Sequence, residues 1–441
     1  MCIIHHQWYW VKVNEALNTT DVIVAIFARG NTILKITNVD FFQINPKLPA
    51  RYADQKPRFA GMDQQTVFKV STDNGIVGYG DSTSHVTMSD QEIDRLIDRS
   101  PFDFINGALP NGLMGALYDV MGKHIGQPAY KLMGPKVRDR VPVAAWTRST
   151  SPEDLAREIQ RAVAEGYMMF KMHTAAFFDV LELVSAVEAV APNGFKMHFD
   201  FNHNRSVAHV IRLIYELEKS PVMGVIEDPL VWSDIGGWRR LREQTMIPLL
   251  MHVPQLGGGP EIINGCADLY MVGHGLGPSL ARGYACAEAK LSTVVQWTGG
   301  TLAKAMALHL GAVIPNVSHS VNLDDLYAED VTGGRIEIEE GSSPVPESPG
   351  LGVDVDEQAL ERIKRNPVTV VPRYISRLLL PSGHVYLSIG HPDVSRQAGF
   401  MEGNIRGVRL EIWEEDGSAE WRNSYDRLEQ SGLSDGGYSN G

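Results

Sequence analysis

Two short apolar segments that each end at a carboxylate decide the fold: residues 195–202 read Phe-Lys-Met-His-Phe-Asp-Phe-Asn, and residues 225–229 read Val-Ile-Glu-Asp-Pro. Between them, residues 207–217 place apolar side chains at a helical spacing. A helix that joins two strands in this way makes the strands parallel. Asp200 and Glu227 are therefore expected at the same, C-terminal end of one sheet.

Two carboxylates that converge on one point repel each other unless a cation lies between them. A hard divalent cation with oxygen ligands suits such a pair, and the C-terminal end of a parallel barrel is where active sites lie. Alternatively, Asp200 and Glu227 cap helices or close turns, as Asp often does after a strand. Their equivalent positions in consecutive units favour the metal interpretation.

The same unit recurs on both sides of this stretch. Apolar strand candidates start near residues 141, 169, 196, 223, 249, 269, 293 and 312, and most intervals carry a helical pattern. The spacing of roughly 19 to 28 residues fits the βα units of a TIM-type barrel, and eight strands complete it. The predicted fold class is therefore α/β, with a barrel over residues 141–330.

The flanking segments differ from the barrel in composition. Residues 32–140 read as a small α+β domain with a hairpin turn at Asn74-Gly75. Residues 331–365 form a return segment, and residues 366–430 form a β-rich extension. Residues 1–31 are expected to be a loose arm, and the polar, Gly/Ser-rich residues 431–441 to be disordered.

Composition narrows the classes of function. The net charge of −13 leaves no basic surplus for nucleic-acid phosphates. No run of eighteen apolar residues predicts a membrane span, and the N-terminus has no signal-peptide pattern. Three cysteines, Cys2, Cys266 and Cys286, match neither a disulfide framework nor a zinc site. These features indicate a protein of the reducing cytoplasm.

Several motifs, taken in order, resemble the enolase superfamily in its mandelate racemase/muconate lactonizing subgroup. They include the hairpin at residues 72–76, the helix at 116–123, the strand at 170–173, Asp-Phe-Asn at 200–202, Glu-Asp-Pro at 227–229 and Pro-Gly-Leu-Gly-Val at 349–353. The resemblance covers roughly residues 33–365 and implies a modified (β/α)7β barrel with a capping domain. It also implies Mg²⁺, or Mn²⁺ or another divalent ion, and removal of a proton alpha to a carboxylate.

The resemblance assigns Asp200 and Glu227 as metal ligands. The third ligand in the family is an acid at the end of the fifth strand, but here the nearest candidate is His252. An imidazole favours a transition metal over Mg²⁺. Asn202, Asp228 and His274 are expected around the metal or the substrate.

The second barrel strand carries the expected catalytic pair. Lys171 and His173 lie two residues apart, so both side chains are expected inside the barrel. His173 stands where the family has its base, and a histidine suits proton transfer near neutral pH. Alternatively, it is a hydrogen-bonded interior residue. The Asp–His dyad of many subgroup members is missing, and His319 is a candidate acid near the end of the eighth strand.

The predicted function is metal-dependent abstraction of an alpha proton, with dehydration of an acid sugar to a 2-keto-3-deoxy product favoured. Arg51 and Arg58, in a loop that maps to the flexible loop of the capping domain, are candidates to contact the small anionic substrate. One alternative is a racemase or epimerase of a small carboxylate. Another is a barrel that has lost catalysis and serves as a binding or assembly protein. The family resemblance also implies a homo-oligomer.

Overall fold

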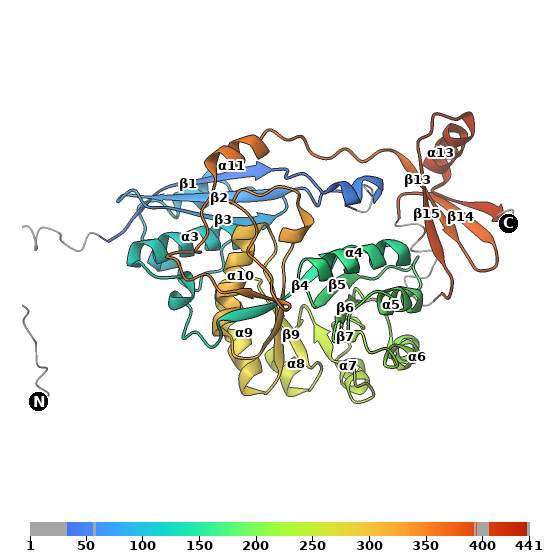
Figure 1. The fold of residues 1–441 in the computed structure, drawn as a ribbon, viewed down its shortest axis with the longest axis horizontal. Helices are drawn as coiled ribbons and strands as arrows, with labels where there is room; N and C mark the ends of the chain where they lie inside the picture. Colours follow the sequence, from blue (N-terminus) through green and yellow to red (C-terminus); the bar gives the residue numbers. More distant parts are fainter. Residues whose placement is uncertain (1–32, 56–58, 392–393, 395–404, 439–441) are drawn as a thin grey trace, which may run out of the picture.

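The computed structural model describes residues 33–438 apart from 56–58, 392–393 and 395–404. The predicted N-terminal arm therefore lies outside the described residues. Three sheets are present: a capping sheet, a central barrel and a C-terminal sheet. In Figure 1 the capping sheet and the C-terminal sheet lie at opposite ends of the molecule, with the barrel between them.

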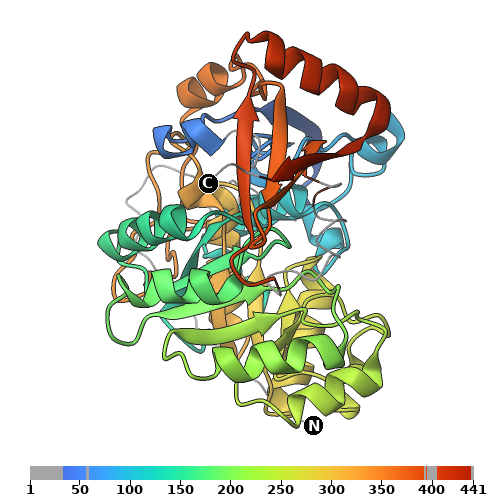
Figure 2. The ribbon, with the colours of Figure 1, turned by 90° about the vertical axis from the view of Figure 1, so that its right-hand side faces the viewer.

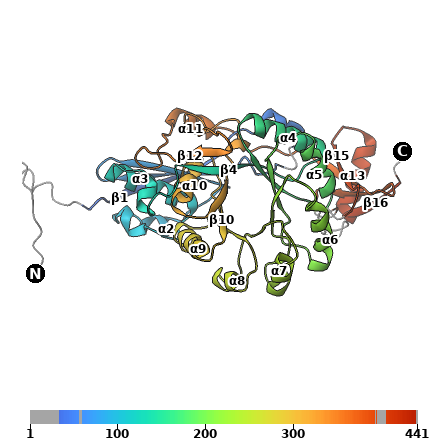
Figure 3. The ribbon, with the colours of Figure 1, turned by 60° about the horizontal axis from the view of Figure 1, so that its bottom comes forward.

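The barrel is a closed ring of eight parallel strands, because β11 pairs with β4 as well as with β10. Its strands are β4 (Arg140–Thr147), β5 (Met169–His173), β6 (Lys196–Asp200), β7 (Met223–Glu227), β8 (Leu249–Met251), β9 (Leu269–Val272), β10 (Ser292–Gln296) and β11 (Val317–Val321). Its helices are α4 (Pro152–Ala164), α5 (Val180–Glu188), α6 (Val207–Leu217), α7 (Ile235–Arg242), α8 (Gly259–Ile263), α9 (Leu276–Glu288) and α10 (Thr301–Val313). Figure 3 shows α4 to α9 arranged around the strands.

The predicted barrel is confirmed, but its eighth strand starts later than predicted. The expected start near Ala312 falls inside α10, and β11 begins at Val317. The run Ala312-Val313-Ile314 is apolar and fully buried at the end of the helix. A short buried apolar run has no periodicity that separates a strand from a helix end.

The capping domain is a three-stranded antiparallel sheet packed on a helix. Its main elements are β1 (Ile36–Ile44), β2 (Gln65–Thr72), β3 (Val77–Thr83), α2 (Asp90–Asp94), α3 (Asn111–Ile125) and α11 (Glu357–Ile363). Short 3-10 turns lie at η1 (Ala50–Gln55), η2 (Pro101–Phe104), η3 (Ala129–Leu132) and η4 (Asp324–Leu326), and β12 (Ser342–Pro344) pairs with β4. Strand β3 lies so close to α3 that a side chain at Gly80 would overlap the helix backbone.

The C-terminal extension is an antiparallel sheet with one helix. Its elements are β13 (Tyr374–Leu379), β14 (His384–Ile389), β15 (Arg409–Glu414), α13 (Ala419–Ser431) and β16 (Leu433–Tyr438), and Figure 2 shows its sheet and helix facing the viewer. The prediction of a disordered tail over residues 431–441 was wrong up to residue 438, because Leu433–Tyr438 pairs with β14, and residues 439–441 lie outside the described residues. Helix α13 was not predicted either.

The capping domain covers the interior of the barrel at its C-terminal end. Inward-facing apolar residues of six strands form one buried cluster with Tyr52 and Phe59 of the capping domain. The loop that carries Tyr52 is hydrogen-bonded to α4, since the Tyr52 hydroxyl donates to Glu158 Oε2 over 3.2 Å. The strand ends therefore meet under a layer of capping-domain side chains. No helix among the described residues has both the length and the apolar composition needed to cross a bilayer.

Candidate active site at the C-terminal end of the barrel

Strand register brings the predicted residues to one level. His173 on β5 pairs with Asp200 on β6, and Asp200 pairs with Glu227 on β7. All three are the last residues of their strands. Because successive side chains of a strand point to opposite faces, Lys171, two residues before His173, points to the same interior. The geometry thus gathers four of the sequence-predicted residues.

Lys171 lies between the two carboxylates and is completely buried. Its Nζ is 2.6 Å from Glu227 Oε2 and 3.4 Å from Asp200 Oδ2. Burial opposes the charge of Lys171, but Glu227 and Asp200 outweigh it and raise the pKa of the ammonium. The space between the two acids is therefore held by an internal cation.

Glu227 is the most heavily contacted acid of the site. Its Oε2 faces Lys171 and also the Nε2 of His198 at 2.7 Å, while its Oε1 lies 2.9 Å from His252 Nδ1. Burial alone would raise the pKa of Glu227, but Lys171, His198 and His252 hold it well below its ordinary value. Glu227 is thus an ionised carboxylate surrounded by three donors.

His198 is a site residue that the sequence reading missed, although a signal existed: it lies two residues before Asp200 and so points to the same interior. Its Nε2–H donates to Glu227, which leaves its Nδ1 to accept from His319 Nε2 over 3.0 Å. Burial lowers the pKa of both imidazoles, that of His319 well below its ordinary value. Both histidines are neutral in this chain.

His319 was predicted to act as an acid beside His173, and the structure does not place it there. It is 1% exposed and faces His198. It is absent from the lining of the cavity that His173 reaches. A buried neutral imidazole with this partner is a hydrogen-bonded interior group.

His173 opens onto a cavity of about 270 Å³ at the ends of β4, β5 and β6. Its side chain is 35% exposed, and its Nδ1 is 3.2 Å from Asp200 Oδ2 and 3.1 Å from Asn202 Oδ1. Two oxygen acceptors fix the proton on Nδ1, so the unprotonated Nε2 is available to the cavity. The cavity is lined by Trp146, Arg148, Ser149, His173, Thr174 and Asn202.

Asn202 holds this arrangement from the loop after β6. Its Nδ2 donates to the Thr174 carbonyl over 3.2 Å, which turns its Oδ1 toward His173. Its backbone is left-handed, with φ of 53°, a conformation that Asn tolerates better than most residues. The predicted place of Asn202 beside the base is therefore reached through an unusual backbone turn.

The predicted metal ligands do not come together as expected. Within the described part of the chain, the one compact group of possible ligands is Glu227, Asp228 and His252, whose donor atoms lie within 4.8 Å of one another. Asp200 is not part of it. Asp228 accepts from the His252 backbone N–H over 2.9 Å, and burial together with Glu227 and Asp200 raises its pKa to about 7.

His252 and His274 form a second histidine pair at the rim. Their Nε2 atoms are 2.9 Å apart, and their rings stack with centroids 5.1 Å apart. Burial lowers the pKa of His252, but Glu227 outweighs this and raises it. Burial and the neighbouring His252 lower the pKa of His274. The pair therefore shares one proton. This proton resides mainly on His252, because His252 lies next to Glu227.

These residues do not fit a Mg²⁺ site. Lys171 holds the space between Asp200 and Glu227, and the third position carries an imidazole rather than an oxygen. Mg²⁺ prefers an octahedron of oxygen ligands.

Arg51 of the capping domain does not line the cavity as predicted. Arg51 Nε pairs with Glu158 Oε1 at 3.1 Å, and its Nη2 donates to the Asp325 carbonyl over 2.7 Å. Arg58 lies outside the described residues. The cationic side chain at the cavity is instead Arg148, whose Nη2 lies 3.3 Å from Met62 Sδ.

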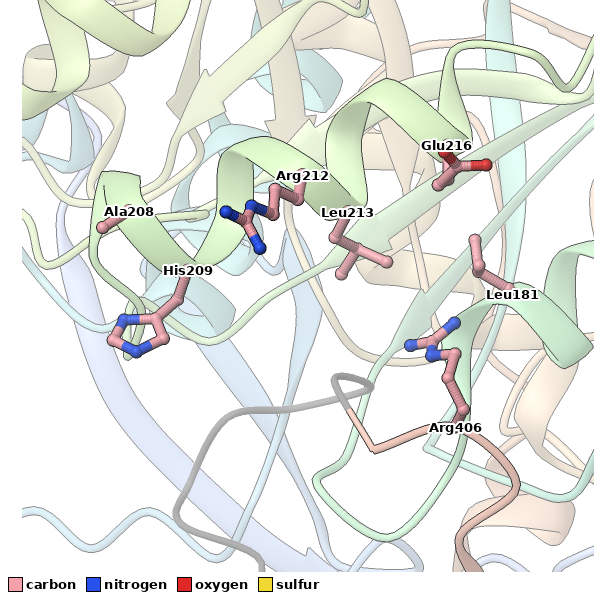
Figure 4. A pocket seen from close by; sticks show the side chains of 7 residues that line it. All are labelled: Leu181, Ala208, His209, Arg212, Leu213, Glu216 and Arg406. Carbon is pink, nitrogen blue, oxygen red and sulfur yellow. The ribbon is translucent and has the colours of Figure 1, made fainter.

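A larger hollow of about 380 Å³ lies on the outer face of the barrel. Figure 4 shows its lining, which comes from α5, α6 and the C-terminal extension: Leu181, Ala208, His209, Arg212, Leu213, Glu216 and Arg406. It contains none of the side chains at the strand ends. The mouth cavity beside His173 therefore remains the candidate active site.

Comparison with known proteins confirms the resemblance over the barrel domain. Residues 154–253 and 266–359 match the family model described as Enolase C-terminal domain-like. An N-succinyl-L-Arg/Lys racemase of Bacillus cereus is 23% identical over 377 residues, covering 75% of this chain and 98% of that protein. A D-galactonate dehydratase of Variovorax paradoxus is 26% identical over 362 residues, covering 68% and 91%. The barrel therefore carries an Enolase C-terminal domain-like domain, and the relatives of the chain include dehydratases and racemases.

Solved structures agree on the fold. An isomerase from Streptomyces coelicolor A3(2) superimposes with a TM-score of 0.62 at 24% identity, covering 75% of this chain and 97% of that chain. An enolase from Pseudomonas fluorescens Pf0-1, solved with bound magnesium, potassium and tartrate, has a TM-score of 0.62 at 18% identity, covering 75% and 92%. The matched family model ends at residue 359, before the C-terminal extension.

Proposed function

We propose that the chain removes the proton alpha to the carboxylate of a small hydroxy acid, with His173 as the base, and that an acid sugar losing water is the favoured substrate class. The observation that carries the proposal is the orientation of His173. Its Nδ1 is held by Asp200 and Asn202, and its other nitrogen opens onto the cavity. The names of the dehydratase relatives support the same substrate class.

Arg148 would hold the substrate carboxylate. It is the one cationic side chain among the residues that line the cavity, apart from the titratable His173. A guanidinium binds a carboxylate through two parallel hydrogen bonds and remains charged at all working pH values. The same positive charge stabilises the enediolate that forms when the alpha proton leaves.

The elimination needs one base on one face. His173 Nε2 takes the alpha proton, and the electrons of the C–H bond pass into the enediolate. These electrons then form the carbon–carbon double bond as the bond to the beta hydroxyl breaks. The imidazolium returns its proton to the departing oxygen, which leaves as water. The enol tautomerises to the 2-keto-3-deoxy acid.

Racemisation is less well supported by the cavity. It requires a second base on the opposite face of the alpha carbon. Among the six residues that line the cavity, His173 is the only one whose side chain commonly serves as a general base. The lining therefore favours elimination over a two-base reaction.

Proton exchange in deuterated water tests this proposal directly. Acid sugars and hydroxy acids would be incubated with the protein, once with Mg²⁺ or Mn²⁺ and once with a chelator, and followed by NMR and by 2-keto product. Replacing His173→Asn should reduce exchange by about 10²- to 10⁴-fold. The matched control is His209→Asn, an exposed histidine of the outer hollow. Equal exchange by the His173 variant and the wild type would refute the role of this residue.

Binding without chemistry is a second candidate, favoured by the position of Lys171. Both metal-ligand positions of the resemblance, Asp200 and Glu227, already face this internal cation. In that case the cavity would bind a small carboxylate such as tartrate without proton exchange. Calorimetry showing saturable binding, with no deuterium uptake by any bound acid, would support this reading over the enzymatic one.

A further inference from the structure

We propose that the Lys171 ammonium is a built-in cation that replaces a divalent metal ion at the centre of this barrel, so that the folded chain binds neither Mg²⁺ nor Mn²⁺ between Asp200 and Glu227. The proposal concerns the electrostatics of the site and does not depend on the proposed reaction. Four observations support it.

The first observation is the position of the ammonium. β5, β6 and β7 are neighbours, and Lys171 reaches across from β5 to both acids. Its side chain is 0% exposed, as is that of Glu227, and that of Asp200 is 4% exposed.

The second observation is that each carboxylate oxygen already lies close to a nitrogen-bearing group of the chain. Asp200 Oδ1 accepts from the Asn202 backbone N–H over 2.8 Å, and its Oδ2 faces Lys171 and His173. Glu227 Oε2 faces Lys171 and His198, and its Oε1 faces His252. A metal ion would have to displace several of these groups from their acceptors.

The third observation is the charge count. Asp200 and Glu227 supply two negative charges, and Lys171 supplies one positive charge. A divalent ion added to these three charges would leave one positive charge in a buried site without a counter-charge, and uncompensated buried charge is costly.

The fourth observation is the chemistry of the third position. His252 offers a nitrogen where an oxygen donor would serve Mg²⁺. Within the described residues, the compact group around it leaves Asp200 out. The imidazole at residue 252 and the position of Lys171 between the two acids therefore both favour a centre whose negative charge is balanced by side chains of the chain itself.

Titration of the purified, chelator-treated full chain with Mn²⁺ tests the proposal. Calorimetry and the electron paramagnetic resonance signal of free Mn²⁺ would be used as readouts. The wild type should show no stoichiometric binding at millimolar Mn²⁺. Lys171→Met removes the internal cation and leaves the two acids, so its affinity for Mn²⁺ should rise by roughly a hundredfold or more.

The controls isolate the site. Lys304→Met removes another buried lysine, which pairs with Asp324 at 3.0 Å, and should not gain affinity. Adding Glu227→Gln to Lys171→Met should abolish the gained binding. Lys171→Gln provides a second neutral variant if the methionine variant does not fold, as judged by circular dichroism.

Two results would overturn the proposal. One is stoichiometric Mn²⁺ binding by the wild type that Glu227→Gln abolishes. The other is a folded neutral variant at Lys171 that binds Mn²⁺ no better than the wild type. Neither result depends on turnover, so failure of this proposal and failure of the proposed reaction are distinguished.

Discussion

Raising the pH from about 6 to about 9 should weaken the connection between the capping domain and the barrel through Asp81. This carboxylate of β3 is 1% exposed and accepts from the backbone N–H groups of Gly300 and Ala303, at the start of α10, over 2.8 and 2.7 Å. Burial and the nearby Asp330 raise its pKa to about 8, although the two N–H groups oppose this shift. Asp81 is therefore protonated in the folded protein near neutral pH.

The sign follows from proton binding. In the unfolded chain Asp81 is ionised throughout this range, because its ordinary pKa is about 4. The folded protein binds a proton there below about pH 8, so the free energy of unfolding falls as the pH rises. With a folded pKa of about 8, the loss attributable to Asp81 between pH 6 and pH 9 is about 3 kcal/mol.

Asp81→Asn is the matched variant, because an amide has nearly the shape of a protonated carboxyl group. At pH 6 the free energies of unfolding of the two proteins should differ by only about 1 kcal/mol. At pH 9 the variant should have gained about 3 kcal/mol in free energy of unfolding relative to the wild type. Urea unfolding of both proteins, followed by tryptophan fluorescence at each pH, measures the difference, and the shared contribution of Asp228 cancels. Parallel pH profiles for the two proteins would refute the reasoning.

Three further substitutions test the packing. Arg161→Met leaves Asp325 buried without its 2.9 Å partner, and should cost about 3 kcal/mol or more in urea unfolding. Trp421→Ala leaves a cavity in the core of the C-terminal extension and should lower the free energy of unfolding of that unit by about 3 to 5 kcal/mol. The expected readout is faster hydrogen exchange confined to residues 374–438. Gly350→Ala should lower the melting temperature, because its φ is 75° and an added Cβ would overlap Asp119.

The barrel was predictable because the spacing of its units and its strand ends follow simple rules. The apolar pattern at residues 207–217 coincides with α6, and the two acids lie level in adjacent strands. His198 was not predicted as a site residue because the prediction used only the residues at strand ends, and His198 lies in the middle of β6. Its position two residues before Asp200 was the available signal, since side chains on one face repeat every second residue.

The C-terminal extension was harder to predict. Its strands were expected, but α13 was not, although Ser418 caps it and Trp421, Tyr425 and Leu428 follow a helical spacing. The polar residues after 431 lack the composition of a strand. They form β16 because β14 offers an unpaired edge, which is tertiary context that local sequence does not contain.

Strand register and side-chain identity control different properties of the site. Strand register sets the level of Asp200 and Glu227 along the barrel axis, and it would do so with any side chain at the neighbouring positions. What the two acids face depends on the side chains around them: Lys171 and His173 for Asp200, and Lys171, His198 and His252 for Glu227. An ion-pair network of this kind contains its own counter-charges, whereas three converging acids would need a metal to be stable. A change at one strand end, residue 252, is therefore enough to alter the chemistry of the centre while the barrel keeps the geometry of its family.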